Sequence, residues 1–324
     1  MRSRALLVLC LWCLSSAFAH AQQKYPQRPV RFIVPYPPGG STDYTAREIA
    51  PRLSEMWGQQ LVIDNRAGAG SLIGHGLAAG ATPDGYTLLL GTSAGLALAP
   101  ALGAKTSYDP HKDFAPIGLA VYAPYLLVVP AVSPATNMRE FIEHAKKSPG
   151  KLNFGSSGTG TPNHLGGELL NILGGVRTVH VPYKGGAFAI TDLIGGQLQY
   201  MFSAIPQMLP HVKTGRLRAL AIGHPTRTRA APDAPPLADT LPGFNNTSFY
   251  GLLAPARTPR DIVMRINTDL NKLLAQPEFT QRMLMQGVEP ASSTPEGLAE
   301  IIRAEGERWS SVIKKAGIVG EAIR

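Results

Sequence analysis

The sequence is poor in cysteine, and its two cysteines, Cys10 and Cys13, both lie near the start of the chain. If that segment is removed after export, the rest of the chain cannot use disulfide bonds, thiol catalysis or thiolate metal sites. Charged residues are also sparse, at 16% of 324 residues, whereas hydrophobic residues make up 44%. This much apolar material is enough for a core and excludes a disordered chain.

Other absences exclude whole classes of function. Lysines and arginines are scattered, with no long basic run, so we expect no nucleic-acid binding despite a net charge of +9. The eight histidines show no HExxH or HxH spacing, and the phosphate-binding lysine of a P-loop is missing. We therefore expect neither a metal nor a cofactor.

The first 21 residues have the pattern of a secretory signal peptide. Arg2 and Arg4 precede a ten-residue apolar stretch, and small residues at Ala19 and Ala21 provide a cleavage pattern. The apolar stretch is too short for a membrane-spanning helix, which needs about 20 residues. We expect residues 1–21 to be removed and the remaining chain to be periplasmic.

Apolar runs alternate with helix-like periodicity in the part of the chain that follows. The runs at 30–34, 61–63 and 86–90 each lead into a glycine-rich turn and then into a stretch with helical spacing. This alternation predicts an α/β fold with a mostly parallel sheet. Ligands of such sheets bind at the carboxyl ends of the strands, which is where these turns lie.

A second unit of the same kind follows the first. It continues to a proline-rich loop at 226–242, and a strand at 249–253 then precedes a region with helical periodicity alone. The simplest arrangement is two lobes joined by two crossing segments, with a cleft between the lobes. We assign residues 22–125 and 253–324 to the first lobe and residues 126–252 to the second.

Three of the glycine-rich turns share a chemistry that suits an anion. The turns at 39–43, 91–95 and 155–161 offer hydroxyls and free backbone N–H groups at expected helix N-termini. The helix dipole and its unsatisfied donors favour negative charge there. Capping by Ser, Thr and Asp explains any one turn alone, but three turns at one sheet edge favour the binding of a carboxylate.

One of these turns also matches a hydrolase motif. Residues 91–95 read Gly-Thr-Ser-Ala-Gly and follow a strand, which is the setting of a serine nucleophile. No acid with a later histidine lies in a recognisable turn. An exported serine hydrolase with Ser93 as the nucleophile is the alternative to a binding protein. His164 and His180 flank a predicted helix of the second unit and could line the cleft.

Six segments, in this order along the chain, carry a family resemblance. They are RPVRFIVPYPPGGSTDYTAR (28–47), VIDNRAGAGSLIG (62–74), ATPDGYTLLLGTSA (81–94), PGKLNFGSSGTGTPNHL (149–165), VHVPYKGG (179–186) and GLLAPARTP (251–259). Together they resemble the Bug family, the extracytoplasmic solute receptors of tripartite tricarboxylate transporters. The resemblance covers nearly all of the chain that follows the signal peptide.

The resemblance implies a type II periplasmic binding protein fold, which is a two-lobed clamp that closes on its ligand, and no enzymatic activity. It implies that the protein captures a small carboxylate, such as a di- or tricarboxylate, an aromatic acid or an acidic amino acid. Delivery would be to the permease subunits of the transporter in the membrane. We expect the receptor to be a monomer.

The resemblance also implies which residues contact the ligand. These are Tyr36, Gly39, Gly40, Ser41 and Asp43 in one loop, Ser156, Ser157, Gly158, Thr159 and Thr161 in the facing loop, and Ser93 and Ser203. Many relatives have an acid or an amide where this chain has Ser203, and many have Phe at the position of Tyr36. The far half of the ligand is therefore unassigned. Asp43 would repel an anion, so we expect it to cap the helix, hold a water molecule or meet an ammonium group.

Overall fold

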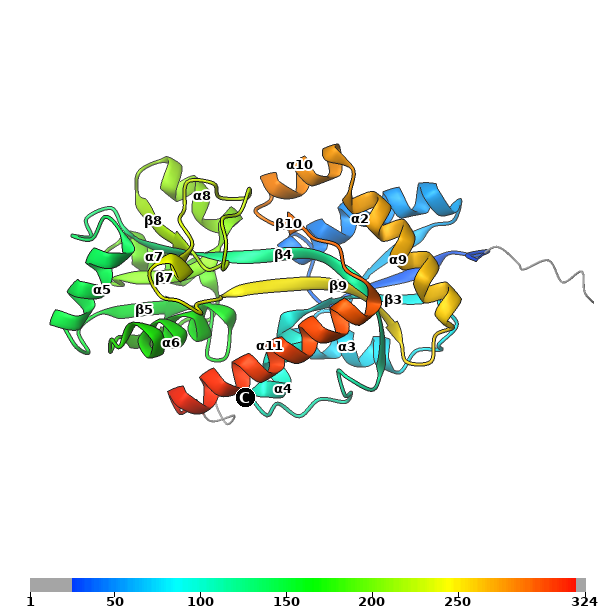
Figure 1. The fold of residues 1–324 in the computed structure, drawn as a ribbon, viewed down its shortest axis with the longest axis horizontal. Helices are drawn as coiled ribbons and strands as arrows, with labels where there is room; N and C mark the ends of the chain where they lie inside the picture. Colours follow the sequence, from blue (N-terminus) through cyan, green and yellow to red (C-terminus); the bar gives the residue numbers. More distant parts are fainter. Residues whose placement is uncertain (1–24, 319–324) are drawn as a thin grey trace, which may run out of the picture.

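The computed structural model describes residues 25–318 and shows two groups of elements linked by long strands (Figure 1). The segment interpreted as a signal peptide lies outside these residues. The strands are β1 (Val30–Val34), β2 (Leu61–Asn65), β3 (Thr87–Thr92), β4 (Phe114–Pro130), β5 (Asn153–Ser156), β6 (Val179–Pro182), β7 (Tyr200–Ala204), β8 (Leu217–Ile222), β9 (Thr247–Pro255) and β10 (Glu289–Pro290).

Helices alternate with the strands until β9 and dominate the chain after it. They are α2 (Ser41–Trp57), α3 (Leu72–Ala79), α4 (Ala99–Ala101), α5 (Met138–Lys147), α6 (Pro162–Gly174), α7 (Gly186–Ile194), α8 (Ile205–Lys213), α9 (Arg260–Leu274), α10 (Pro277–Met285) and α11 (Pro295–Ala316), with short helices η1 (Ala69–Ser71), η2 (Ala94–Leu98) and η3 (Leu237–Asp239). The predicted α/β fold is confirmed.

Two runs of parallel strands are joined through antiparallel strands. β1 pairs in parallel with β2 and β3, and β5 pairs in parallel with β6 and β7. β9 is antiparallel to β3 and β4, and β4 is antiparallel to β7 and β8. The strands are therefore parallel within each run, as the alternating pattern predicted, and antiparallel where the two groups are joined.

β4 is the strand that both groups of elements share. Its residues 114–124 pair with β9, and its residues 125–130 pair with β7 and β8. At the junction the N–H of Tyr125 donates to the carbonyl of Asn246 at 3.3 Å, and the N–H of Gly223 donates to the carbonyl of Tyr125 at 2.7 Å. A Cβ atom on Gly223 would lie only 2.7 Å from the carbonyl oxygen of Asn246. Three chain segments thus meet closely at this point.

Each group has its own hydrophobic core. In the first group, α2 buries Ile49 against the strands, where Phe32 is also fully buried. In the second group, α5 and α6 bury Phe141 and Leu165 around Phe154 of β5. These apolar positions recur at helical spacing on each helix, which is why one face of each helix packs on the sheet.

Helix α11 contacts both groups of elements. Its first half places Leu298 and Ile302 in a cluster with Leu253 of β9. Its second half places Trp309 in the cluster that surrounds Phe154 of the second group. The last helix therefore lies across both groups (Figure 1). The lobe boundaries given above, which put the whole C-terminal segment in the first lobe, stay a prediction.

Replacing Trp309 tests how much this helix contributes to stability. The side chain is 2% exposed, so Trp309→Ala should lower the free energy of unfolding by about 3 to 5 kcal/mol. Urea unfolding followed by circular dichroism measures the change. Ser311→Ala, an exposed change on the same helix, is the control. A W309A protein as stable as the parent would show that this contact does not hold α11 in place.

Candidate functional site

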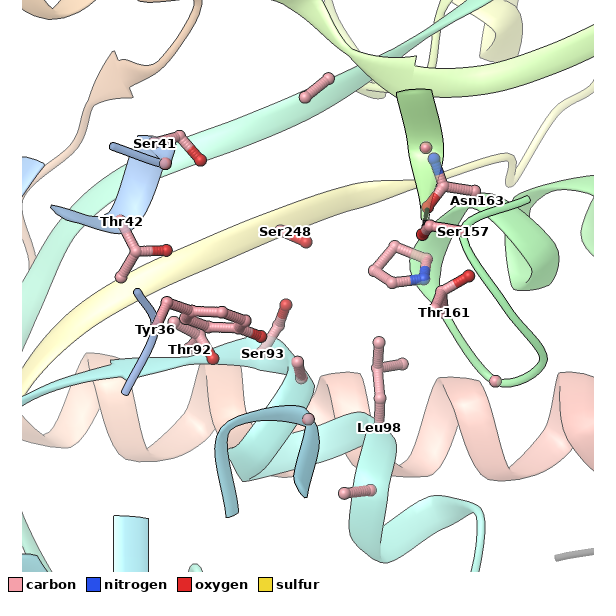
Figure 2. A pocket seen from close by; sticks show the side chains of 18 of the residues that line it. Tyr36, Ser41, Thr42, Thr92, Ser93, Leu98, Ser157, Thr161, Asn163 and Ser248 are labelled. Atoms are coloured by element: carbon pink, nitrogen blue, oxygen red, sulfur yellow. Dashed lines mark hydrogen bonds between the residues drawn. The ribbon is translucent and has the colours of Figure 1, made fainter. Parts of the chain in front are cut away.

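A cavity of about 620 Å³ lies between the two groups of elements. Its wall contains the loop from β1 to α2, the turn from β3 into η2, the loop from β5 to α6, and the first residues of α7 and α8 (Figure 2). The connecting strands β4 and β9 add Tyr125, Ser248 and Tyr250. Both groups and both connecting strands therefore form one site.

No side chain in the wall of this cavity carries a formal charge. The described residues that line it are Ser, Thr, Asn, Gln and Tyr together with Gly, Ala, Pro and Leu.

Within residues 25–318, no group of three or more His, Cys, Asp or Glu side chains could hold a metal ion. In the same range, no helix combines the length and the hydropathy that crossing a membrane requires. An anion in the cavity would depend on neutral donors.

The N-terminus of α2 forms one wall of the cavity. Gly40, Ser41 and Thr42 line the cavity, and the first N–H groups of a helix have no acceptor within the helix. Gly40 is the N-cap in an extended conformation, and no side chain caps the helix. Free N–H groups and the positive end of the helix dipole are therefore available to a ligand here.

Asp43 lies behind this loop and does not line the cavity. Its carboxylate accepts hydrogen bonds from the N–H of Gly39 at 3.0 Å, from Arg47 at 2.8 Å and from the amide of Asn65 at 2.9 Å. Burial alone would raise the pKa of this carboxyl, but the three hydrogen bonds outweigh burial and hold the pKa below its usual range. Asp43 is therefore ionised, and its hydrogen bonds hold the loop in place.

Hydroxyl groups from the loop after β1 and from β9 lie beside the start of α2. The hydroxyls of Ser41 and Tyr250 are 2.8 Å apart, and Tyr36 lines the same wall. Burial raises the pKa of both Tyr36 and Tyr250, so both phenols keep their protons. This wall therefore offers neutral O–H donors as well as backbone N–H groups.

A buried histidine holds two other segments of the first group together. His75 is fully buried, with Nδ1 2.9 Å from the carbonyl of Ser71. Its Nε2 accepts the N–H of Thr92 at 3.3 Å. Burial lowers the pKa of His75 to about 4, so the ring is neutral and uses both nitrogens on backbone groups. Thr92 and Ser93 line the cavity at the point that this histidine fixes.

The loop from β5 to α6 forms the opposite wall, where Ser157 and Thr161 face the cavity (Figure 2). The hydroxyl of Ser157 donates to Oδ1 of Asn163 at 2.8 Å. The amide of Asn163 in turn donates to the carbonyl of Phe202 at 2.6 Å. The loop is thereby tied to the neighbouring strand β7.

The predicted contact residues divide into two sets. Tyr36, Gly40, Ser41, Ser93, Ser157, Thr159 and Thr161 line the cavity. Gly39, Asp43, Ser156, Gly158 and Ser203 do not line it. Ser203 is fully buried, and its hydroxyl donates at 2.8 Å to Oε1 of Gln207, which lines the cavity. Ser203 therefore holds a wall residue in place. The role of these twelve residues in ligand binding stays a prediction.

Sequence reasoning missed two further helix N-termini. α7 reaches the cavity at Gly186, and α8 reaches it at Gln207. The signals were the glycine pair Gly185-Gly186 and a proline in the first turn of α8, Pro206, because proline is favoured there. Leu98 of η2 was also missed, and it belongs to an apolar part of the wall (Figure 2).

Comparison with known proteins identifies the family. Residues 45–318 match the model of the tripartite tricarboxylate transporter family receptor. The chain belongs to this family. It is 33% identical to protein BugT of Bordetella pertussis (strain Tohama I) over 97% of this chain and 98% of that protein. The expected membership of the Bug family is confirmed.

Two solved structures of similar proteins contain carboxylates. Rpa4515 of R. palustris, solved with adipate, is 35% identical, with a TM-score of 0.78 over 91% of this chain and 99% of that one. MatC of Rhodopseudomonas palustris, with bound malate, is 33% identical, with a TM-score of 0.72 over 89% of this chain and all of that one. The predicted periplasmic binding protein fold is confirmed.

Family membership also decides between the two functions weighed from the sequence. The protein is a periplasmic solute receptor and not an enzyme, so the serine hydrolase alternative is wrong. The geometry agrees: Ser93 has ordinary helical angles, φ −54° and ψ −31°, where a nucleophile would sit on a strained turn. The Gly-x-Ser-x-Gly segment at 91–95 is therefore a turn in the cavity wall.

The lowered pKa of His75 predicts how stability depends on pH. An unfolded imidazole titrates near pH 6.5, and the folded one near 4. Between these values the unfolded chain binds more protons, so stability falls as pH falls. His75→Gln removes this proton difference and should reduce the slope of unfolding free energy by about 1.4 kcal/mol per pH unit.

Urea unfolding at several pH values between 7 and 4 measures this slope. His111→Gln, at an exposed histidine, is the control and should leave the slope unchanged. An equal slope in H75Q and the parent would mean that His75 is protonated in the folded protein.

Proposed function

We propose that this receptor binds a small carboxylate in the cavity and delivers it to the membrane permease of a tripartite transporter. The candidates are di- and tricarboxylates, aromatic acids and acidic amino acids. One observation carries the proposal: the N-termini of α2 and α6 line opposite sides of a cavity that has no cationic side chain. Such helix ends are ready-made sites for an anionic group.

The strength of hydrogen bonds supports a carboxylate as the bound group. Hydrogen bonds to an ionised acceptor are about twice as strong as those between neutral groups. Their contribution grows in a cavity from which water is excluded. Neutral N–H and O–H donors from both groups of elements can thus hold one carboxylate without an ion pair.

The similar structures support the same ligand class. Rpa4515 was solved with adipate and MatC with malate, and both ligands are dicarboxylates. In this chain, Leu98 and Leu102 give the cavity an apolar side. We infer that the carbon body of the ligand packs there while the carboxylate meets the helix ends.

Capture would follow from rotation of the two groups of elements about β4 and β9. Within residues 25–318, β4 and β9 are the strands that run between the groups, and both line the cavity. A small change at the junction would therefore move one wall toward the other. We further infer that the signal peptide, residues 1–21, exports the protein and that the receptor acts as a monomer.

A panel of acids tests the proposed ligand class. Adipate, malate, citrate, benzoate and glutamate are added to the purified receptor, and thermal unfolding is recorded. At least one acid should raise the melting temperature increasingly with its concentration, because only the folded state binds it. The diamide of adipate, which is uncharged, is the control and should have no effect. Failure of every acid would contradict the proposal.

A side chain at Gly40 tests where the ligand binds. Apart from its chain neighbours, no protein atom lies within 4 Å of the position that a Cβ atom on Gly40 would take. We therefore expect Gly40→Leu to occupy part of the cavity and to leave the fold intact. We expect the acid-induced shift in melting temperature to disappear. Gly306→Leu on α11 is the matched control, because a Cβ atom there also has no neighbour within 4 Å. Undiminished binding by G40L would place the ligand elsewhere.

A further inference from the structure

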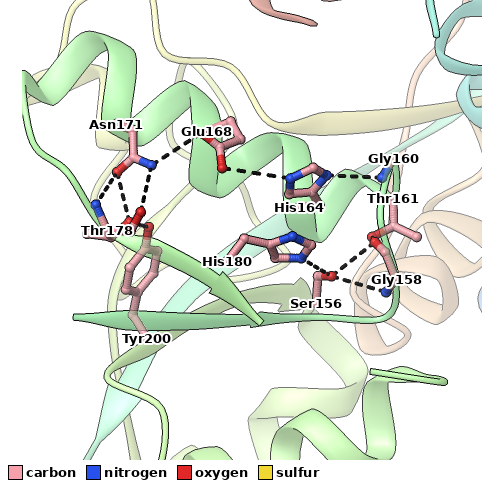
Figure 3. A network of polar contacts seen from close by, with 10 residues as sticks. All are labelled: Ser156, Gly158, Gly160, Thr161, His164, Glu168, Asn171, Thr178, His180 and Tyr200. Carbon is pink, nitrogen blue, oxygen red and sulfur yellow. Dashed lines mark hydrogen bonds and ion pairs between the residues drawn. The ribbon is translucent and has the colours of Figure 1, made fainter. Parts of the chain in front are cut away.

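Two histidines lie stacked directly behind the loop from β5 to α6 (Figure 3). The ring centroids of His164 and His180 are 3.8 Å apart, and the ring planes differ by 19°. Phe154 stacks on the pair, with its ring centroid 5.1 Å from that of His180. Neither histidine lines the cavity, in contrast to the alternative that the sequence left open.

Each ring bonds a different point of the loop. Nδ1 of His164 accepts the N–H of Gly160 at 3.0 Å. Nε2 of His180 is 2.6 Å from the hydroxyl oxygen of Ser156. That oxygen in turn accepts the N–H of Gly158 at 3.1 Å. The two rings therefore fix the loop on both sides of Thr159.

The loop needs this support because of its backbone conformation. Gly158 and Gly160 have φ angles of +132° and +78°, a region that other residues rarely adopt. Glycine has many alternative conformations in a free loop, so external contacts must select the one that is observed. Ser157, Thr159 and Thr161, which alternate with these glycines, line the cavity, and so does Gly160.

The chemistry of the neighbours keeps His164 in the required tautomer. Because Nδ1 accepts a hydrogen bond, the ring proton is on Nε2, which lies 3.7 Å from Oε1 of Glu168. Asn171 donates to the other oxygen of Glu168 at 3.2 Å and also accepts from Thr178. Glu168 on α6 is the titratable group beside the pair, and Tyr200 on β7 lies farther along the network, next to Thr178 (Figure 3). Burial and His164 lower the pKa of His180 to about 4.

We propose that His164 and His180 are positioning residues, which hold this loop in the shape that presents its donors to the ligand. The effect on ligand affinity rests on the proposed carboxylate-binding function, whereas the effect on the loop does not. Each ring acts through one nitrogen on one loop residue: His164 through Nδ1 on Gly160, and His180 through Nε2 on Ser156.

Reciprocal amide substitutions separate this role from simple packing. The side-chain amide of Asn lies near the Nδ1 position of histidine, and that of Gln reaches the Nε2 position. His164→Asn should therefore keep the acceptor for Gly160, whereas His164→Gln should lose it. At the second site the order is reversed, so His180→Gln should keep the contact with Ser156 and His180→Asn should lose it.

The first measurement needs no ligand. Amide hydrogen exchange of Gly160 and Gly158, followed by NMR on the full chain, should be slow in the parent, H164N and H180Q. Exchange of Gly160 should be faster in H164Q by about tenfold, the factor that one lost hydrogen bond supports, and exchange of Gly158 should respond in the same way in H180N. Melting temperatures of the four variants serve as the control for packing.

The second measurement is affinity for whichever acid of the panel binds the parent most tightly. The two variants that lose the contact should bind it about tenfold more weakly, and the other two should bind it as the parent does. If exchange and affinity follow melting temperature instead of this reciprocal order, the positioning role is wrong. If no acid binds the parent, the proposed function fails, and the exchange pattern still decides whether the rings hold the loop.

Discussion

One constraint shapes the site: no cationic side chain lines the cavity, so an anion there would be bound by neutral donors alone. A lysine or arginine attracts a carboxylate over several ångströms and adapts to its position, whereas a hydrogen bond weakens steeply with distance and angle. Donors on the backbone must therefore be held in place before the ligand arrives. The buried polar side chains behind the wall meet this need: Asp43 and His75 brace the first group of elements, and His164 and His180 contact the loop of the second.

The charges of these groups suit a site for an anion. Asp43 is ionised and stands one residue from the cavity wall, where its charge would repel a carboxylate. Arg47, 2.8 Å from it, offsets that charge, and hydrogen bonds lower the pKa of its carboxyl group. His75 and His180 are neutral because burial lowers the pKa of each to about 4. The electrostatic field at the cavity wall therefore comes mainly from the N-termini of the helices.

Local sequence patterns predict much of the fold and part of the site. The features that they miss depend on tertiary contacts. Alternating apolar runs and glycine-rich turns predict the α/β fold and the two loops at the ends of β1 and β5. The apolar run at 126–129 predicts only one end of the 17-residue strand β4. The rest escapes prediction because Pro116 and Pro124 normally end a strand, and here one of them lies at a register shift. Ser203 contacts the cavity-lining residue Gln207, and Asp43 contacts its three hydrogen-bond partners. Such contacts depend on the folded structure, so the sequence pattern of a single segment does not predict them.

The same helix ends link binding to closure. The N-termini of α2 and α6 both carry partial positive charge and lie in opposite walls. Bringing them together without a ligand would set like charges against each other, and it would remove water from N–H groups that have no other acceptor. A carboxylate between them reverses both effects, because it supplies the negative charge and the acceptors at once. Under the proposed closure, an anion therefore favours the closed form through its own bonds, and an uncharged solute of the same size does not.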